Sequence, residues 1–309
     1  MVRYSGSLRK IIRRLLGRKG VFAARNILSS MFYTLGIYEK PSRPDGVSAI
    51  TLSYNEEDWI RYSLLSIKDF VDEFIVMDSS TDNTPNIVKE LIEKERLNIR
   101  YYYVPPGNIA ETRNRALELS RYKWILVWDP DFVLFDDSIN TLRKVIENLD
   151  PNKHYLVYWP WITICGDLCH VCSENPYHIE HWMYTYSSKT RYGYVDIFDS
   201  LYAPATLYRV HMINRPLGLH ISARNPVRTA VRVIWYRYRE IFDRSSEDRI
   251  ELAKKLAMKD FGSDDLYEVG LRIIREEIKR LPLYREEIYG RYPLLLRDQY
   301  LKCFERYTR

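Results

Sequence analysis

The sequence lacks the features that mark membrane-spanning, secreted and disulfide-rich proteins. No run of about 18 uncharged apolar residues occurs, so we expect no transmembrane helix. No small-residue cleavage site follows an apolar stretch near the N-terminus, so we expect no signal peptide. Only four cysteines occur in 309 residues, too few for a disulfide framework, which predicts unpaired cysteines and a reducing, cytoplasmic compartment. We also find no internal repeat and no low-complexity tract.

Basic residues are in excess over acidic ones. The chain has 47 lysines and arginines against 41 aspartates and glutamates, which gives a formal net charge of +6. This excess favours an anionic partner, such as a nucleotide, a membrane surface or a nucleic acid. No recognisable nucleic-acid-binding motif is present, so we expect no nucleic acid partner. Hydrophobic residues make up 46% of the chain and charged residues 28%, a composition typical of globular proteins.

Residues 1–46 combine basic character with helical periodicity. Apolar residues recur at the spacing of one helix face: Leu8, Ile11, Ile12, Leu15 and Leu16. Basic residues occupy positions between them: Arg9, Lys10, Arg13, Arg14, Arg18 and Lys19. Such a helix either lies in the interface of an anionic membrane or buries its apolar face on the rest of the protein. Residues 5–35 are therefore expected to form a basic helical extension, with peripheral membrane attachment as one of two interpretations.

From residue 47 onward, short apolar runs alternate with amphipathic stretches. The pattern predicts strands at 47–53, 73–77, 99–104 and 124–128, with helices between them. Later segments predict a helix at 138–150, a strand at 155–161, one or two short strands between 192 and 210, and helices across 225–245, 247–259 and 264–280. Strands and helices in alternation form a doubly wound, mostly parallel α/β sheet with helices on both faces.

Two carboxylates, those of Asp129 and Asp131, follow directly after the fourth predicted strand. Pro130 between them ends the strand, because proline has no N–H to donate. Open α/β sheets bind ligands at the carboxyl ends of their strands. Oxygen ligands suit Mg²⁺ or Mn²⁺, and these ions commonly bridge substrate phosphates. The motif therefore indicates either a metal–diphosphate site or, more simply, two acids in a polar turn.

Four motifs together resemble those of family 2 glycosyltransferases with the GT-A fold. They are Tyr54-Asn55-Glu56-Glu57, Asp78-Ser79-Ser80-Thr81-Asp82-Asn83-Thr84, Gly107-Asn108-Ile109-Ala110-Glu111-Thr112-Arg113-Asn114-Arg115 and Asp129-Pro130-Asp131. They occur in the family's order and at its spacing, over roughly residues 47–137. The resemblance implies a UDP- or GDP-sugar donor, Mn²⁺ or Mg²⁺ as cofactor, and a glycan or lipid-linked acceptor. It also implies transfer of a hexosyl or N-acetylhexosaminyl group, with inversion.

The resemblance also implies a division of the chain and a role for each motif residue. Residues 47–222 would be the catalytic domain, with a nucleotide-sugar half at 47–137, an acceptor half at 138–222 and a helical region after it at 223–309. Three residues would line the base and ribose: Leu52, Tyr54 and Glu56. Asp78 would hydrogen-bond the base, and Arg113 would lie near the nucleotide or its diphosphate. Asp129 would contact ribose or sugar, while Asp131 would bind the metal. From the residues alone, Asp78 could instead cap a helix and Arg113 could lie on a solvated helix face.

The catalytic base is expected after the metal site. Inverting members of the family often use the Asp of a Glu-Asp pair that opens a helix. Glu180-His181 occupies that place, with histidine where aspartate usually stands. Glutamate, aspartate and histidine side chains can each act as a base. The order of candidates is Glu180, then Asp167, then His181. The alternative without a catalytic role is that Glu180 caps a helix and His181 packs on an aromatic surface. His220 could serve as an additional metal ligand by resemblance, or it could be an ordinary surface histidine.

The cysteines allow a zinc site as an alternative to small buried side chains. Cys165, Cys169 and Cys172 would supply three ligands. The fourth would come from one of three histidines: His170, His178 or His181. The first spacing is longer than in paired zinc knuckles, and no second pair follows.

Two other functions compete with sugar transfer. A nucleotidyltransferase would also use acids and a metal on an α/β sheet, but it commonly carries a glycine-rich, lysine-containing phosphate loop after its first strand. Residues 53–56 contain no such loop. A non-catalytic membrane-surface protein would rely on the basic segments alone.

Overall fold

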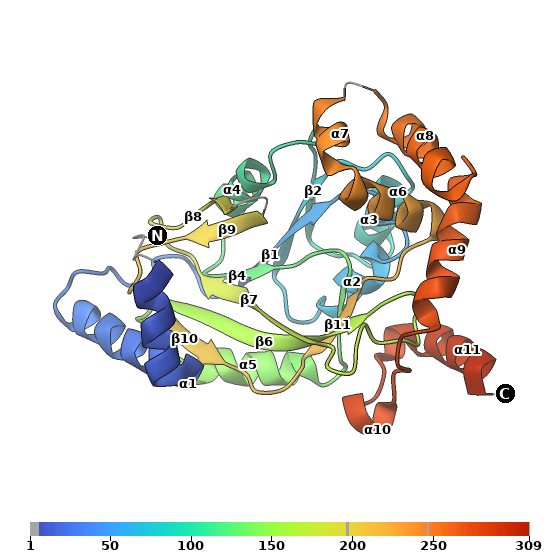
Figure 1. Ribbon diagram of the computed structural model, residues 1–309. Helices are drawn as coiled ribbons and strands as arrows, with labels where there is room; N and C mark the ends of the chain where they lie inside the picture. The colour runs from blue at the N-terminus through green and yellow to red at the C-terminus, as the bar shows by residue number, and fades with distance from the viewer. Residues whose placement is uncertain (1–5, 196–197, 246, 309) are drawn as a thin grey trace. The chain divides into compact units, whose positions relative to one another are not determined.

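The computed structural model describes residues 6–195, 198–245 and 247–308 (Figure 1). The chain forms two compact units. The first consists of Met1–Pro160 and Ile179–Leu217, and the second consists of Trp161–His178 and Gly218–Arg309. Each unit is described by itself.

A mostly parallel sheet forms the centre of the first unit. Its strands are β1 (Val47–Ser53), β2 (Glu73–Asp78), β3 (Ile99–Tyr103), β4 (Trp124–Val127), β6 (Tyr155–Ile164, up to Pro160 in this unit), β7 (Tyr177–Thr185) and β10 (Arg209–Met212). Four of these strands are parallel, as predicted, and lie in the order β3-β2-β1-β4, while β7 lies antiparallel beside β4. The chain therefore builds outward from β1 to β3 and then returns to place β4 on the other side of β1. Such a reversal is where open α/β sheets bind ligands.

The central strands are apolar because both of their faces are covered. Ile50 of β1 pairs with Ile75 of β2 and with Val127 of β4. Ile50 and Ile75 are fully buried, and Val127 is 7% exposed. Strands buried on both faces appear in a sequence as continuous apolar runs rather than as alternating patterns. This is why the strands β1, β2 and β4 could be recognised from the sequence, whereas β3 is only partly buried.

Helices and a hairpin complete the first unit. They are α1 (Gly6–Thr34), α2 (Ile60–Ser66), α3 (Thr84–Glu93), α4 (Ile109–Leu119), the short strand β5 (Phe132–Leu134), α5 (Ser138–Asn148) and the antiparallel pair β8 (Arg191–Val195) and β9 (Phe198–Tyr202). Asn108 caps α4 as predicted, with its Oδ1 accepting a hydrogen bond from Glu111 N at 3.1 Å. The side-chain amide of Asn114 in α4 donates to Tyr192 O and accepts from Tyr192 N, which fixes the hairpin on the helix.

Helix α1 is attached to the first unit by its second half. Asn26 donates to Val210 O at 2.9 Å and accepts from Val210 N at 2.6 Å, so its amide completes the free edge of β10. The Tyr33 hydroxyl lies 2.6 Å from His154 Nδ1. This half of the extension therefore packs on the protein. The apolar and basic side chains singled out between Leu8 and Lys19 lie outside the described residues. Among the helices described, none is long and apolar enough to cross a membrane.

The second unit is mainly helical, in agreement with the predicted C-terminal helical region. It contains the end of β6, β11 (Gly218–Ile221), α6 (Pro226–Arg237), α7 (Arg239–Arg244), α8 (Arg249–Phe261), α9 (Leu266–Ile278), α10 (Glu286–Tyr289), a 3₁₀ turn η1 (Leu294–Leu296) and α11 (Arg297–Thr308). Helices α6 and α9 approach so closely at Gly270 that a Cβ atom there would lie only 1.8 Å from Pro226 O. Apolar side chains of α6 to α9 form a core of their own, including Ile234 and Ala253.

The expectation of unpaired cysteines is wrong. Cys165 pairs with Cys172 within one loop, and Cys169 pairs with Cys303 of α11. The alternative of a zinc site at Cys165, Cys169 and Cys172 is not formed either, because these cysteines are in disulfides. The small number of cysteines gave no sign of the second pair, because Cys169 and Cys303 are 134 residues apart and only the packing of α11 brings them together.

Candidate active site

Two loops at the carboxyl ends of β1 and β2 are tied together by side chains of the predicted motifs. Asn55 adopts a left-handed backbone with φ 56°, which asparagine tolerates better than most residues. The Asn55 side-chain Oδ1 accepts from Thr81 N at 2.7 Å, and the Asn55 backbone N–H donates to Ser80 Oγ at 2.7 Å. Glu56 N donates to Thr84 Oγ1 at 2.9 Å. The polar residues of these motifs therefore hold the two loops in one arrangement.

The three residues expected around a nucleoside lie at this end of β1. Leu52 is the last but one residue of β1 and is partly buried, while Glu56 is 8% exposed. Tyr54 is 44% exposed, so its ring is accessible to a flat ligand. An exposed aromatic ring held by a rigid loop can stack on a base.

Asp78 is fully buried at the end of β2. One of its oxygens accepts from the hydroxyl and backbone N–H of Ser80, and the other accepts from Tyr101 Oη at 2.7 Å. Burial, followed by the hydrogen bond and charge of Asp78, raises the pKa of Tyr101, so this hydroxyl stays protonated and donates. Within the described part of the chain, Asp78 caps no helix, since α3 begins after Asn83, so the helix-cap interpretation of this residue is wrong.

Arg113 of α4 joins two carboxylates at the reversal point of the sheet. Its Nε donates to Asp199 Oδ2 at 2.6 Å, and its Nη2 donates to Asp129 Oδ1 at 3.2 Å. The Arg113 side chain is only 8% exposed, so the interpretation as a solvated helix face is wrong. Among the described residues no hydrogen-bond partner reaches its buried Nη1. A buried guanidinium N–H without a partner is the kind of group that an anionic ligand would satisfy.

Asp199 was not among the residues predicted from the sequence. It lies on β9, 86 residues after Arg113, in a short hairpin with no recognisable motif. The available signal was a lone acid in a strand, which does not distinguish a site residue from a surface residue. The hairpin reaches Arg113 because Asn114, the next residue of α4, binds the backbone of Tyr192.

Negative charge exceeds positive charge in this cluster. Burial raises the pKa of the Asp129 carboxyl, the charges of Asp131 and Asp199 raise it further, and Arg113 opposes them. Burial alone would lower the pKa of Arg113, but the carboxylates of Asp129 and Asp199 outweigh it and raise that pKa. Asp129 is one-third exposed and Asp131 is partly buried. Three carboxylates around one guanidinium, with Asp129 partly accessible, are a suitable environment for a cation.

Glu180 and His181, the first and third candidates for the base, lie on strand β7. The expectation that they open a helix is wrong, since the run Tyr177–Thr185 is apolar and aromatic enough to join the sheet beside β4. Their side chains lie outside the described residues.

Asp167 and His220 belong to the second unit. Asp167 accepts hydrogen bonds from Cys169 N at 3.0 Å and Tyr307 Oη at 2.9 Å, and its Oδ1 lies 2.7 Å from His170 Nδ1. Burial alone would raise the pKa of Asp167, but these hydrogen bonds outweigh it and lower that pKa, so this carboxylate is a weak base. His220 lies on β11 opposite Thr163 of β6.

Substitution of Asp199 tests the buried ion-pair network. Asp199→Asn leaves the Arg113 guanidinium with one carboxylate partner in a buried position, which should lower the free energy of unfolding by about 2 kcal/mol. Asp137→Asn removes an exposed partner of Arg215 and should cost less than about 1 kcal/mol. Urea unfolding of both variants makes the comparison. Equal, small losses would show that Arg113 does not depend on Asp199.

Comparison with known proteins gives a family and several relatives. The model of glycosyl transferase family 2 matches residues 48–213. The prophage-derived glycosyltransferase SunS of Bacillus subtilis is 32% identical over 114 residues, which is 37% of this chain and 26% of the relative. An uncharacterized glycosyltransferase of Mycoplasma pneumoniae is 32% identical over 78 residues, 25% of this chain and 26% of the relative. The chain spans about a quarter of the length of these curated relatives.

Among solved structures, S. aureus TarS 1–349 in complex with UDP-GlcNAc is 14% identical, covering 75% of this chain and 81% of that chain with a TM-score of 0.40. The mannosyltransferase PcManGT from Pyrobaculum calidifontis, in complex with GDP-Man and Mn²⁺, is 16% identical, covering 92% of this chain and 91% of that chain with a TM-score of 0.38. The family assignment rests on the model that matches more than half of the sequence, across the strands, loops and carboxylates described above. The chain belongs to glycosyl transferase family 2.

Proposed function

We propose that the protein transfers a sugar from a nucleotide-sugar donor to an acceptor hydroxyl, with the help of a divalent cation and with inversion. The observation that carries the proposal is the cluster of Arg113, Asp129 and Asp199 at the reversal point of the sheet. A nucleoside diphosphate has a flat base and a charged diphosphate. The loop that presents Tyr54 suits the base, and the buried Nη1 of Arg113 suits a diphosphate oxygen.

The donor set suits Mn²⁺ or Mg²⁺. Asp131 and Asp129 supply hard oxygen ligands. Burial raises the pKa of the Asp129 carboxyl, and the charges of Asp131 and Asp199 raise it further, so a cation would relieve part of this cost. We assign Asp131 as the principal metal ligand and Asp129 as its neighbour, held in place by Arg113. A bound cation neutralises charge on a departing nucleoside diphosphate.

Glu180 is our proposed general base. Strand β7 runs antiparallel to β4, with Met183 opposite Leu126. Following this register backward along β7 brings the backbone of Glu180 toward the end of β4, where Asp129 follows. The carboxylate would accept the proton of the acceptor hydroxyl as that oxygen attacks the sugar. Asp167 is the weaker candidate because hydrogen bonds already occupy both of its oxygens.

The metal role is tested by Asp131→Asn. This variant should fold normally and lose nucleotide-sugar turnover by a factor of about 100 or more, because the cation loses its principal ligand. Asp136→Asn, an exposed acid in the following loop, is the matched control and should retain activity. Turnover is measured as released nucleoside diphosphate with added Mn²⁺ and with a chelator. Full activity of Asp131→Asn, or of the wild type in excess chelator, would remove the cation from the reaction.

The role of Glu180 is tested by Glu180→Gln. Loss of the base should lower kcat by about 100-fold or more, while the donor dissociation constant from calorimetry changes little. Glu118→Gln, on an exposed position of α4, serves as the control. A Glu180→Gln enzyme with wild-type kcat would exclude Glu180 as the base.

We further propose that α1 attaches the enzyme to an anionic membrane, where a lipid-linked acceptor would be accessible. Four large apolar side chains of its second half and the following residue are 46–69% exposed: Ile27, Leu28, Met31 and Leu35. Three of them recur every four residues and so lie on one helix face. An open groove of about 480 Å³ lies beside this row, and Arg209 contributes a cation to it. Exposed apolar side chains next to basic residues are typical of interfacial helices.

Vesicle co-sedimentation tests this surface. The protein should bind vesicles with anionic lipid, and binding should weaken as salt rises because charge attraction is screened. The triple change Ile27→Ser, Met31→Ser and Leu35→Ser should lower binding about tenfold or more, since each side chain loses apolar burial. A matched triple change at exposed positions of α8 and α9, at Ile250, Met258 and Tyr267, should leave binding unchanged. Equal binding by both triple variants would contradict the proposal.

A further inference from the structure

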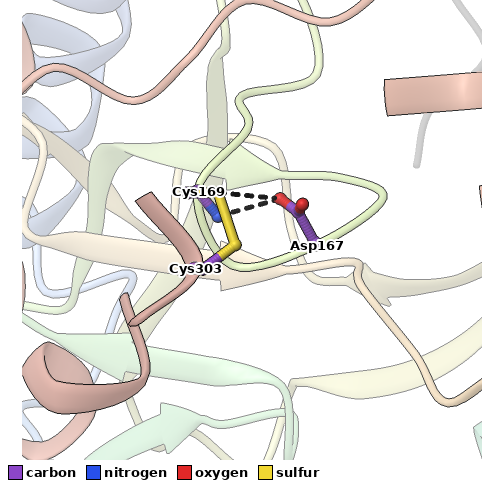
Figure 2. Close-up of side chains that lie close together, drawn as sticks. All are labelled: Asp167, Cys169 and Cys303. Carbon is purple, nitrogen blue, oxygen red and sulfur yellow. Dashed lines mark hydrogen bonds between the residues drawn. A yellow bond between two sulfur atoms is a disulfide. The ribbon is translucent and has the colours of Figure 1, made fainter. Parts of the chain in front are cut away.

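A second cluster of ligating side chains lies in the second unit, between the loop after β6 and helix α11. Asp167, Cys169 and His170 come from one short loop, and Cys303 comes from α11. Figure 2 shows the Asp167 carboxylate next to the sulfur atoms of Cys169 and Cys303, which form a disulfide. The proposed sugar-transfer reaction does not use this cluster.

The distances from Cys169 Sγ to its two neighbouring ligand atoms are close to those of a metal site. One ligand atom each from Asp167, Cys169 and Cys303 lie within 4.8 Å of one another. A tetrahedral zinc site has bonds of about 2.3 Å to sulfur and 2.0 Å to oxygen or nitrogen, which separates neighbouring ligand atoms by roughly 3.3–3.8 Å. Asp167 Oδ1 lies 3.4 Å from Cys169 Sγ, and His170 Nδ1 lies 3.9 Å from the same sulfur. The two sulfur atoms are bonded to each other, and His170 Nδ1 lies 2.7 Å from Asp167 Oδ1. Both pairs must therefore separate, the first by reduction of the disulfide, when an ion binds between them.

The surroundings of the cluster hold its members in place. Tyr307 Oη donates to the second oxygen of Asp167 at 2.9 Å, and its ring packs edge-on against His170 at 4.7 Å between centroids. Tyr292 Oη donates to Leu168 O at 2.7 Å and so fixes the loop between its ligating residues. Cys169 is fully buried, while His170 and Cys303 are 3% and 8% exposed. A hydrogen-bonded carboxylate ligand and a dry environment are what supporting residues provide at metal sites.

We propose that the reduced chain binds a thiophilic divalent cation, Zn²⁺ above all, through Asp167, Cys169 and Cys303, with His170 Nδ1 as the fourth ligand. The same position therefore holds either a disulfide or a metal ion. Thiolate and imidazole ligands select Zn²⁺ over Mg²⁺ and Mn²⁺, so this site is chemically distinct from the carboxylates of Asp129 and Asp131. In both states α11 stays attached to the loop at residues 165–172.

The change of state balances with a reductant of the phosphine class. The phosphine attacks one sulfur with its electron pair, and the S–S bond breaks so that the other sulfur leaves as a thiolate. Water then attacks phosphorus and supplies the oxygen of the phosphine oxide, which releases the first sulfur. The two protons of that water convert both sulfur atoms to thiols. Binding of the cation then displaces the thiol protons, because cysteine binds metal as the thiolate.

Cobalt titration tests the proposal directly. The protein is reduced with a water-soluble phosphine, freed of it under argon and titrated with Co²⁺. We expect one Co²⁺ per chain, thiolate-to-cobalt charge-transfer absorption in the near ultraviolet, the visible bands of a tetrahedral ion, and displacement by Zn²⁺. The oxidised protein should show none of this absorption, because its sulfur atoms are in disulfides.

Variants identify the ligands. Cys303→Ser and Asp167→Asn should each weaken cobalt binding at least about tenfold, and Cys303→Ser should also lose charge-transfer intensity. The matched control changes both Cys165 and Cys172 to serine, which removes the other cysteine pair and should leave the absorption intact. Zn²⁺ should raise the Tm of the reduced wild type, since binding to the folded state stabilises it, and should not raise that of Cys303→Ser. Reduced wild type without charge-transfer absorption, or Cys303→Ser with wild-type absorption, would show that Cys169–Cys303 is a structural disulfide only.

Discussion

The buried guanidinium of Arg113 is the constraint on which the first unit depends. A charged group with a side chain only 8% exposed is costly unless its charge is matched, and here Asp129 and Asp199 match it. The three residues come from α4, from the turn after β4 and from β9. One ion-pair network therefore fixes a helix, a turn and a hairpin around the end of the sheet, and it leaves Asp131 beside them in a field of excess negative charge.

In the loops after β1 and β2, neutral side chains supply hydrogen-bond partners for backbone groups. Backbone N–H groups at strand ends need partners, and side chains of the neighbouring loop supply them: Ser80 for Asn55, and Thr84 for Glu56. The sequence suggested that these motifs contact a ligand. Many of their polar atoms instead bind one another, so fewer of their side chains remain accessible, and Tyr54 is one that does. Rigid loops of this kind pre-organise a binding site, because less conformational entropy is lost on binding.

The second unit uses covalent attachment where the first uses charge. Tyr307 of helix α11 packs on the loop at residues 165–172, and Cys303 connects the helix to Cys169. Asp167 serves this attachment by accepting hydrogen bonds from Tyr307 and from the backbone of Cys169. A carboxylate that appeared in the sequence as a candidate base is thus part of the loop's internal structure. Its lowered pKa follows from these donors, which favour the ionised form.

Local patterns in the sequence determined the strands β1 to β4, the parallel α/β class, the cap at Asn108 and the position of Asp129 and Asp131 at a strand end, because periodicity and turn chemistry act within a few residues. The same patterns gave no indication of Asp199 or Cys303 as partners. Arg113 and Asp199 are 86 residues apart, and Cys169 and Cys303 are 134 apart. Such pairs form only when separate elements pack, so the tertiary structure alone decided which acids meet Arg113, which cysteines pair, and that Glu180 lies on a strand rather than at the start of a helix.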